Sequence, residues 1–180
     1  WMRYYPNGQG IEKCFLEDYA FMTMALWDLD EATFDAKWLI DAKKISKQMI
    51  ELFADRERGG FFLTGNDGEE LITRTKPGSD GAIPSGKSIA ALALLKLGRL
   101  TMNQYFTEQG SNVLEFFSSQ LKKSPSYSSA MLPAVNFWLG PTQEIVIAGS
   151  AEATETKQML KLIGSQVMHN SAVPLPQPGQ

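Results

Sequence analysis

The spacing of apolar residues in the first third of the chain predicts two amphipathic helices. Over residues 15–32 the apolar positions recur at alternating steps of four and three, which is the period of a helix with one buried face. Over residues 35–53 the apolar positions and the lysines separate onto opposite faces in the same way. Because only a few residues around Thr33 connect the two segments, we expect an antiparallel helical hairpin.

The pattern then alternates between short strand-like runs and further helices. Two apolar runs, 61–64 and 71–73, flank the turn sequence Asp67-Gly68 and predict a small β-hairpin. Residues 85–100 are apolar on several sides, as is typical of a buried helix, and Gly98 is expected to end it. Further helices are expected around 106–121, 130–140 and 155–163, and a short strand at 144–149.

These elements predict a mainly α-helical fold. Paired helices with short β excursions are typical of an array of helical hairpins and do not fit a wound α/β sheet. We expect residues 1–165 to form one helical domain. Residues 166–180, which are rich in proline toward the end, are expected to form an extended, disordered tail.

Composition and charge narrow the classes of function. The 180 residues carry a net charge of −3, which gives no general attraction to nucleic acid or to anionic membranes, and no apolar run is long enough to span a bilayer. The single cysteine, Cys14, cannot form an internal disulfide, and the single histidine, His169, excludes chemistry that needs two imidazoles. We therefore expect a cytoplasmic protein with no metal, no cofactor, and no nucleic-acid or membrane partner.

The segment 81–88, GAIPSGKS, matches the phosphate-loop pattern G-x-x-x-x-G-K-[ST]. A phosphate loop follows a buried strand, but the preceding residues, LITRTKPGSD, contain no apolar strand, and Pro84 lacks a backbone N–H that such a loop directs at phosphate. In the alternative interpretation, Ser85 caps the next helix and Gly86 permits the close approach of another segment. We favour the capping interpretation over nucleotide binding, and the role of Lys87 stays open.

Several of these runs, taken in order, resemble a known family. The runs FLEDYAFMTMALWDLDEATFDAKWL, GGFFLTG, DGAIPSGKSIAALALLKL and LGPTQEIVIAG are similar to the C-terminal helical region of the spermatogenesis-associated, thioredoxin-fused proteins, over about residues 3–149. The resemblance implies a thioredoxin-like domain followed by an (α/α)6 toroid, similar to the toroids of N-acylglucosamine 2-epimerases and six-hairpin glycosidases. The chain departs from the family pattern at Lys87, where Asn is usual, and at Asp30, where an aromatic residue is usual.

The resemblance also implies that this chain is a fragment, the later part of the toroid. A partial toroid exposes apolar helix faces, so we expect the fragment to self-associate. In a toroid the ligand binds at the mouth, among helix N-termini. Glu17 and Asp18 open the first helix, and such a carboxylate pair could act as acid and base on a sugar. The alternative is that the two acids are there because the helix dipole stabilises negative charge.

The candidate substrate-binding residues are aromatic and hydroxyl- or carboxyl-bearing. Phe61 and Phe62 could stack on a sugar ring or pack on the helices beneath them. Asp80 could bind a sugar hydroxyl or satisfy backbone N–H groups of its own turn. Tyr19 and Ser85 complete this set. The tryptophans on the apolar stripes, Trp27, Trp38 and Trp138, are expected to lie in the core, and Cys14 is expected to be buried and inert.

Two classes of function therefore remain. The first is a carbohydrate-active or carbohydrate-binding toroid with a sugar as ligand, whose reaction, if it is an enzyme, would be of the epimerase or glycosidase type. The alternative is a non-catalytic scaffold that positions the thioredoxin-like domain implied by the resemblance.

Overall fold

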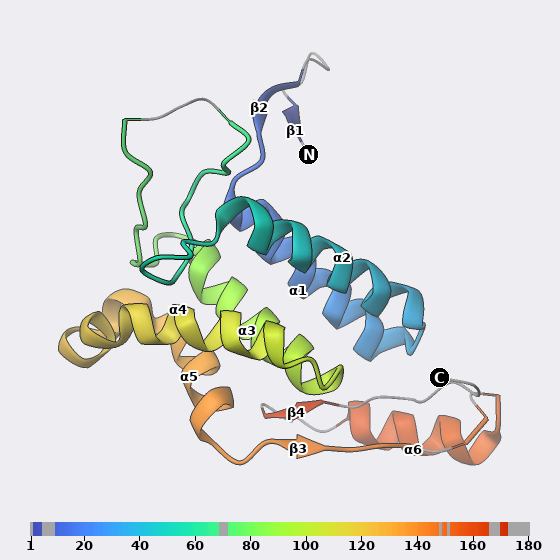
Figure 1. The fold of residues 1–180 in the computed structure, drawn as a ribbon. Helices are drawn as coiled ribbons and strands as arrows, with labels where there is room; N and C mark the ends of the chain where they lie inside the picture. The colour runs from blue at the N-terminus through green and yellow to red at the C-terminus, as the bar shows by residue number, and fades with distance from the viewer. Residues whose placement is uncertain are drawn as a thin grey trace.

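The computed structural model describes residues 2–4, 10–68, 72–147, 149–150, 152–165 and 170–172, and it is mainly helical (Figure 1). Its helices are α1 (Leu16–Thr33), α2 (Ala36–Phe53), α3 (Gly86–Leu100), α4 (Gln104–Lys123), the 3-10 helix η1 (Pro125–Met131), α5 (Leu132–Leu139) and α6 (Thr154–Gly164). Strands β1 (Met2–Tyr4) and β2 (Gly10–Lys13) pair antiparallel, and strands β3 (Gln143–Glu144) and β4 (Ser171–Ala172) pair parallel.

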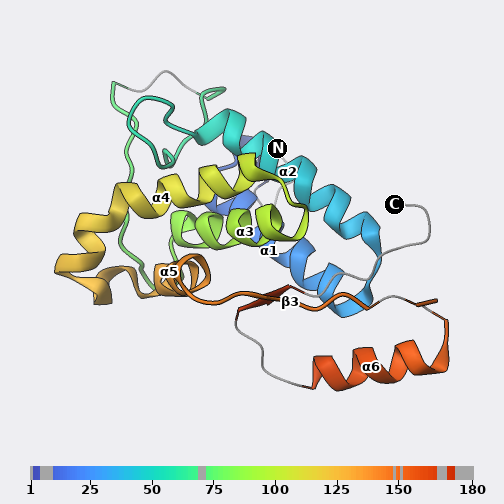
Figure 2. The same ribbon diagram turned by 60° about the horizontal axis from the view of Figure 1, so that its bottom comes forward.

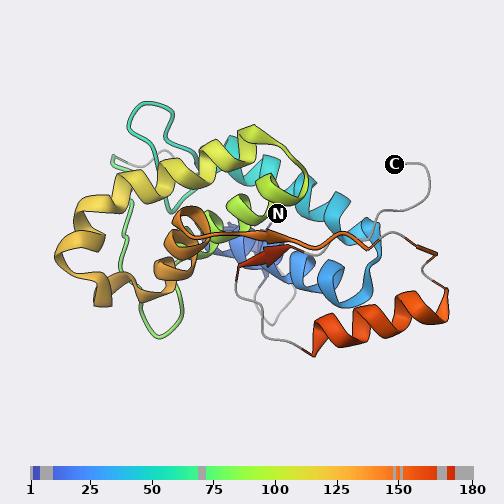
Figure 3. The same cartoon turned by 90° about the horizontal axis from the view of Figure 1, so that it is seen from below.

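The predicted helical hairpin is confirmed, since α1 and α2 run side by side over most of their lengths (Figure 1). Helix α3 packs against both α1 and α4, and α5 and η1 cover another of its sides. Figures 2 and 3 show that α6 lies apart from the group formed by α1 to α4, beyond the segment that contains β3. The core is therefore centred on α3.

Local sequence explains where the helices begin and end. The side chains of Asp35, Ser85 and Asn103 each accept a backbone N–H in the first turn of the helix that follows. Between α1 and α2 the chain reverses at Phe34, which adopts the left-handed conformation with φ 54°. Pro133 lies in the first turn of α5, as its fixed φ favours.

The prediction that Gly98 ends the third helix is wrong. Helix α3 continues to Leu100, and Gly98 is buried inside it against the start of α4. A Cβ at Gly98 would lie 2.2 Å from Oγ1 of Thr107 and 2.7 Å from its backbone nitrogen. Glycine is therefore needed here for the close approach of two helices.

The structure also corrects the predicted β-hairpin of 61–64 and 71–73. Phe61 forms an isolated antiparallel bridge with Ala54, and residues 62–64 and 72–73 are in no strand. The N–H of Phe62 donates to the Phe53 carbonyl at 2.8 Å, and the N–H of Leu63 donates to the Thr75 carbonyl at 2.9 Å. The first run thus pairs with the end of α2 and with a later residue; residues 69–71 lie outside the described part.

The remaining expectations concern the C-terminal part. The strand expected at 144–149 is limited to Gln143–Glu144, because residues 145–147 do not pair and Ala148 lies outside the described residues. Within the expected tail, Ser171–Ala172 form β4, whereas residues 166–169, including His169, and 173–180 lie outside the described residues. None of the described helices combines the length and apolar character needed to cross a membrane.

Candidate functional site

The N-terminal ends of α1 and α3 meet at Gly86. A Cβ at Gly86 would lie 2.8 Å from the Cα and 2.9 Å from the backbone nitrogen of Glu17, so the two helix ends are in backbone contact. This contact brings together the candidate residues at the start of α1 and those of the segment 80–88. The sequence places them about 65 residues apart.

At the start of α1, the side chain of Asp18 serves the helix itself. Its Oδ2 accepts the N–H of Phe15 at 2.8 Å, which satisfies a backbone donor before the first turn. Tyr19 is buried, and its ring meets that of Phe53 edge to face at 5.3 Å between centroids. Burial raises the pKa of the Tyr19 phenol, with smaller contributions from Cys14 and nearby aspartates.

Asp80 organises the turn that leads into α3. Its Oδ1 accepts the N–H of Ser85 at 2.9 Å and the hydroxyl of Ser88 at 3.2 Å, and its Oδ2 accepts the N–H of Ala130 at 2.8 Å. Ser85 caps α3 by accepting the N–H of Ser88 at 3.2 Å, as expected from the sequence. Asp80 therefore ties the start of α3 to η1, and its carboxylate already has three donors.

The two adjacent phenylalanines have different environments. Phe61 is buried in the core, whereas the ring of Phe62 faces cations: the Arg74 guanidinium at 4.2 Å and the Lys76 ammonium at 4.7 Å from its centroid. Lys76 also lies 4.3 Å from the ring centroid of Phe116. Sequence reasoning missed this cluster, because Arg74 and Lys76 lie 12 and 14 residues after Phe62 and no local pattern brings them together.

The Lys76 ammonium has a full set of partners. It lies 2.6 Å from Oδ2 of Asp55 and donates to the Gly59 carbonyl at 2.6 Å. The hydrogen bond from Lys76 holds the pKa of the Asp55 carboxyl down at about 2, against an ordinary value of 3.8. Arg74 donates from its guanidinium to the carbonyls of Thr64 and Leu52. Asp55, Gly59 and Thr64 lie in the same non-helical segment between α2 and α3, so these two cations mainly hold that segment together, and the bond to Leu52 ties it to α2.

Lys87, in the first turn of α3, is buried and lacks such partners. Its side chain is only 2% exposed, and no carboxylate of the described residues lies within 4 Å of its ammonium. The pKa of Lys87 is lowered from 10.5 to about 8, chiefly by burial; Glu17 opposes this shift, and Lys76 makes a smaller contribution in the same direction as burial. The sequence showed this lysine only through a chance phosphate-loop pattern.

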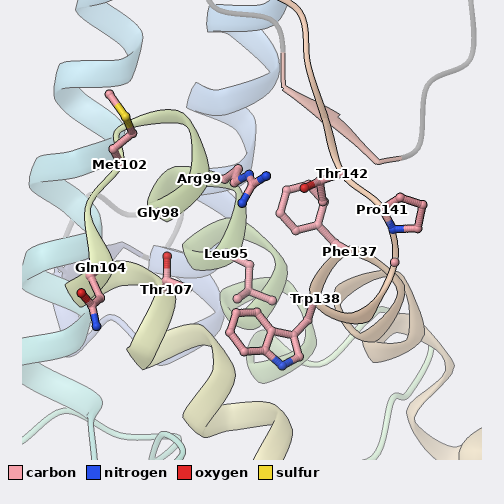
Figure 4. Close-up of a pocket in the computed structure, with 11 residues that line it drawn as sticks. Leu95, Gly98, Arg99, Met102, Gln104, Thr107, Phe137, Trp138, Pro141 and Thr142 are labelled. Atoms are coloured by element: carbon pink, nitrogen blue, oxygen red, sulfur yellow. The ribbon is translucent and has the colours of Figure 1, made fainter.

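A ligand-sized hollow lies at the opposite, C-terminal end of α3. Its volume is about 770 Å³, and it is bounded by the end of α3, the start of α4, the end of α5 and residues 140–142. Figure 4 shows the indole of Trp138 projecting from α5 toward Leu95, with Gln104 and Thr107 on the α4 side. The guanidinium of Arg99 and the hydroxyl of Thr142 also face this region (Figure 4).

The tryptophans were expected to lie in the core, and the structure corrects this for Trp138. Trp27 is buried and Trp38 is half-buried, but Trp138 is 46% exposed and lines the hollow. Cys14 is buried, as expected. In the part of the chain that the structure describes, there is no group of three or more His, Cys, Asp or Glu side chains able to hold a metal ion.

Known proteins that are similar to this chain are several times longer than it is. No family model matches the chain. The chain is 33% identical to spermatogenesis-associated protein 20 of Rattus norvegicus and 32% identical to that of Homo sapiens, each over 160 residues, 88% of this chain and 20% of the relative. It is 24% identical to an uncharacterized protein of Caenorhabditis elegans over 161 residues, 89% of this chain and 22% of that protein.

The chain thus spans about a fifth of the length of the curated relatives it matches. The matched segment includes most of the residues in the helices described above. Homology over 88% of the chain to spermatogenesis-associated protein 20 therefore supports the family resemblance that its sequence shows.

Proposed function

We propose that this chain is a carbohydrate-binding part of an (α/α)6 toroid and that the saccharide occupies the hollow beside Trp138. The observation that carries the proposal is the half-exposed indole on one side of a hollow of about 770 Å³, with polar side chains on the others. This volume is within the range of small-molecule sites. An exposed indole offers the apolar face of a sugar ring a flat surface, and its burial by a ligand is favourable.

The polar side chains of the hollow suit a neutral polyol. Arg99 presents only donors, Gln104 presents both a donor and an acceptor group, and Thr107 and Thr142 present hydroxyls that can do either. Among the described residues that line the hollow, none carries a carboxylate. This arrangement supports binding of hydroxyl groups and offers no acid–base pair of its own.

Catalysis, if the toroid has it, belongs in this proposal to Glu17 and Asp18 at the other end of α3. The contact of Glu17 is with Gly86, whereas the hollow begins at Leu95 and Gly98. At 1.5 Å per residue, the nine residues from Gly86 to Leu95, the nearest lining residue on α3, span about 14 Å. A monosaccharide cannot contact both places, so sugar binding at the hollow and acid–base chemistry at the α1 end are separate claims.

The binding claim is tested by titrating the protein with a panel of mono- and oligosaccharides in a calorimeter, using Trp138→Ala and the neighbouring Leu139→Ala as a matched pair. Leu139 is more exposed than Trp138 and does not line the hollow. We expect Trp138→Ala to abolish binding and Leu139→Ala to preserve it. Equal binding by both variants, or no binding of any saccharide to the unchanged protein, would refute the claim.

The acid–base claim is tested by turnover of the same saccharides. Glu17→Gln should remove turnover while leaving calorimetric binding in the hollow unchanged. Because Asp18 caps α1, Asp18→Asn needs a parallel melting curve to separate loss of the cap from loss of chemistry. Turnover by Glu17→Gln equal to that of the unchanged protein would remove Glu17 from the mechanism.

A second candidate function is a scaffold for the thioredoxin-like domain that the family resemblance implies. Exposed apolar side chains on the α1–α2 pair, Met22, Leu29 and Ile40, favour it, because such surfaces are typical of interfaces. The test is co-purification of a separately expressed thioredoxin-like domain, which Ile40→Asp should weaken while leaving saccharide binding unchanged. For either function we propose a cytoplasmic location, in line with the single cysteine.

A further inference from the structure

A second hollow lies where the turn that follows α2 meets the middle of α4. Its volume is about 480 Å³, which is within the range of small-molecule sites. It shares no lining residue with the hollow beside Trp138. Most of its lining side chains are charged or carry an amide, in contrast to that first hollow: Asp55, Arg56 and Arg58 on the turn, and Gln109, Asn112 and Glu115 on α4.

The turn that carries the two arginines is held in one conformation by Asp55. Oδ1 of Asp55 accepts the N–H of Glu57 at 2.9 Å and the N–H of Arg58 at 3.1 Å. The backbone carbonyl of Asp55 also accepts the N–H of Gly59 at 3.0 Å. Because the backbone of the turn is already ordered, a ligand that binds its side chains does not have to order it.

Two consecutive glycines place this turn directly against α4. Gly59 and Gly60 have φ of 76° and 69°, a conformation that glycine adopts without strain. A Cβ at Gly60 would lie 3.2 Å from Cγ of Phe116, and a Cβ at Gly59 would lie 3.6 Å from the carbonyl oxygen of Asn112. This close approach is the reason why side chains of the turn and of α4 line the same hollow.

The unpaired charge in this hollow is positive. The carboxylate of Asp55 is paired with Lys76, at 2.6 Å from its ammonium. In the described part of the chain, neither Arg56 nor Arg58 has a carboxylate within 4 Å of its guanidinium, so both forks of N–H donors are available. Glu115 is the other carboxylate among the described lining residues, so two available cations face one anion.

We propose that this hollow binds a small phosphate ester that also carries hydroxyl groups, such as a sugar phosphate. The guanidinium forks of Arg56 and Arg58 match the oxygens of a phosphate group, and such hydrogen bonds are charge-assisted. The amides of Gln109 and Asn112 can donate to and accept from hydroxyl groups, and the carboxylate of Glu115 can accept from them. This site is independent of the saccharide site proposed beside Trp138.

The test is a titration of the ¹⁵N-labelled protein with glucose 6-phosphate, followed by the backbone amide signals in NMR, with glucose as the matched probe that lacks the phosphate. We expect glucose 6-phosphate to shift the amides of residues 56–59 and 109–116, and glucose to leave them in place. Absence of these shifts would overturn the proposal. Shifts confined to the surroundings of Trp138 would also overturn it while supporting the saccharide site, so the two proposals fail separately.

Substitutions then identify the groups that bind the phosphate. Arg56→Ala and Arg58→Ala should each weaken the binding of glucose 6-phosphate about tenfold, through loss of charge-assisted hydrogen bonds. Lys44→Ala, which removes an exposed positive charge on α2, is the matched control and should bind as the unchanged protein does. Glu115→Gln should bind more tightly, because it removes the opposing charge. Unchanged affinity in both arginine variants would overturn the proposal.

Discussion

Replacing Asp30 by Asn should stabilise the protein at neutral pH. Asp30 lies in the last full turn of α1 and is only 9% exposed. Burial, followed by the nearby carboxylates of Glu31 and Asp35, raises the pKa of Asp30 from 3.8 to about 6. The helix C-terminus adds to this effect, because it is the negative end of the dipole and the last turn of α1 contains no basic residue.

The sign of the effect follows from proton binding. Between about pH 4 and pH 6 the folded protein holds a proton on Asp30 that the unfolded chain has released, so stability falls as pH rises through this window and then stays level. A shift of about two pKa units corresponds to at most about 3 kcal/mol. Because the carboxylate keeps some contact with solvent, we expect a gain of about 1–2 kcal/mol from the neutral amide.

The assay is urea unfolding followed by circular dichroism at about pH 4 and about pH 8. Asp30→Asn and the unchanged protein should have similar free energies of unfolding at the lower pH, and the variant should be the more stable at the higher pH. Asp41→Asn, at an exposed position on α2, is the matched control for the loss of one carboxylate. A difference for Asp30→Asn that is constant with pH, or a loss of stability at about pH 8, would refute the reasoning.

Three further substitutions test the packing and the turns. Gly86→Ala places a Cβ against the backbone of α1 and should cost about 1–3 kcal/mol in urea unfolding, whereas Gly81→Ala, which meets nothing within 4 Å, should be tolerated. In Asp80→Asn, an NH₂ group replaces one carboxylate oxygen, so one of the donors that Asp80 binds loses its acceptor. The variant should lose about 1–3 kcal/mol of unfolding free energy and exchange the Ala130 amide faster. Met102→Gly should raise the unfolding midpoint by removing about 1 kcal/mol of strain, because Met102 is 91% exposed and has φ 48°; an unchanged midpoint would show that its conformation is not strained.

Sequence reasoning predicted the helices because their signals are local. The apolar period and the capping residues Asp35 and Ser85 act within a few residues, so the bounds of α1 and α2 and the start of α3 follow closely from the pattern. The errors concern longer-range contacts. Gly98 looked like a helix end because the neighbouring α4, which needs the missing side chain, is not visible in the local pattern. The run from 61 to 64 was taken for half of a hairpin because its true partner, the end of α2, precedes it.

For the candidate sites too, features set by local sequence could be predicted and features set by longer-range contacts could not. The capping of α3 by Ser85 could be predicted from the sequence, because Ser85 directly precedes an apolar helix. The exposure of Trp138 could not be predicted. Its position on an apolar stripe does not show whether another element of the fold covers that stripe. The lowered pKa of Lys87 depends on its burial and on Glu17 of α1 and Lys76 of the preceding segment, and no local pattern specifies those neighbours.

The central place of α3 determines the order in which the protein opens. Helix α3 is packed on by α1, α4, α5 and η1, so its backbone amides can reach solvent only when most of these contacts are broken at once. The segment between α2 and α3 is anchored near its two ends, by the buried Phe61 and by Asp80, which accepts the N–H of Ala130, whereas residues 66–68 and 72–73 are exposed. This exposed part can be cut while the helices remain folded, so a protease should cut first at residues 66–68 or 72–73 and leave two helical pieces that stay associated.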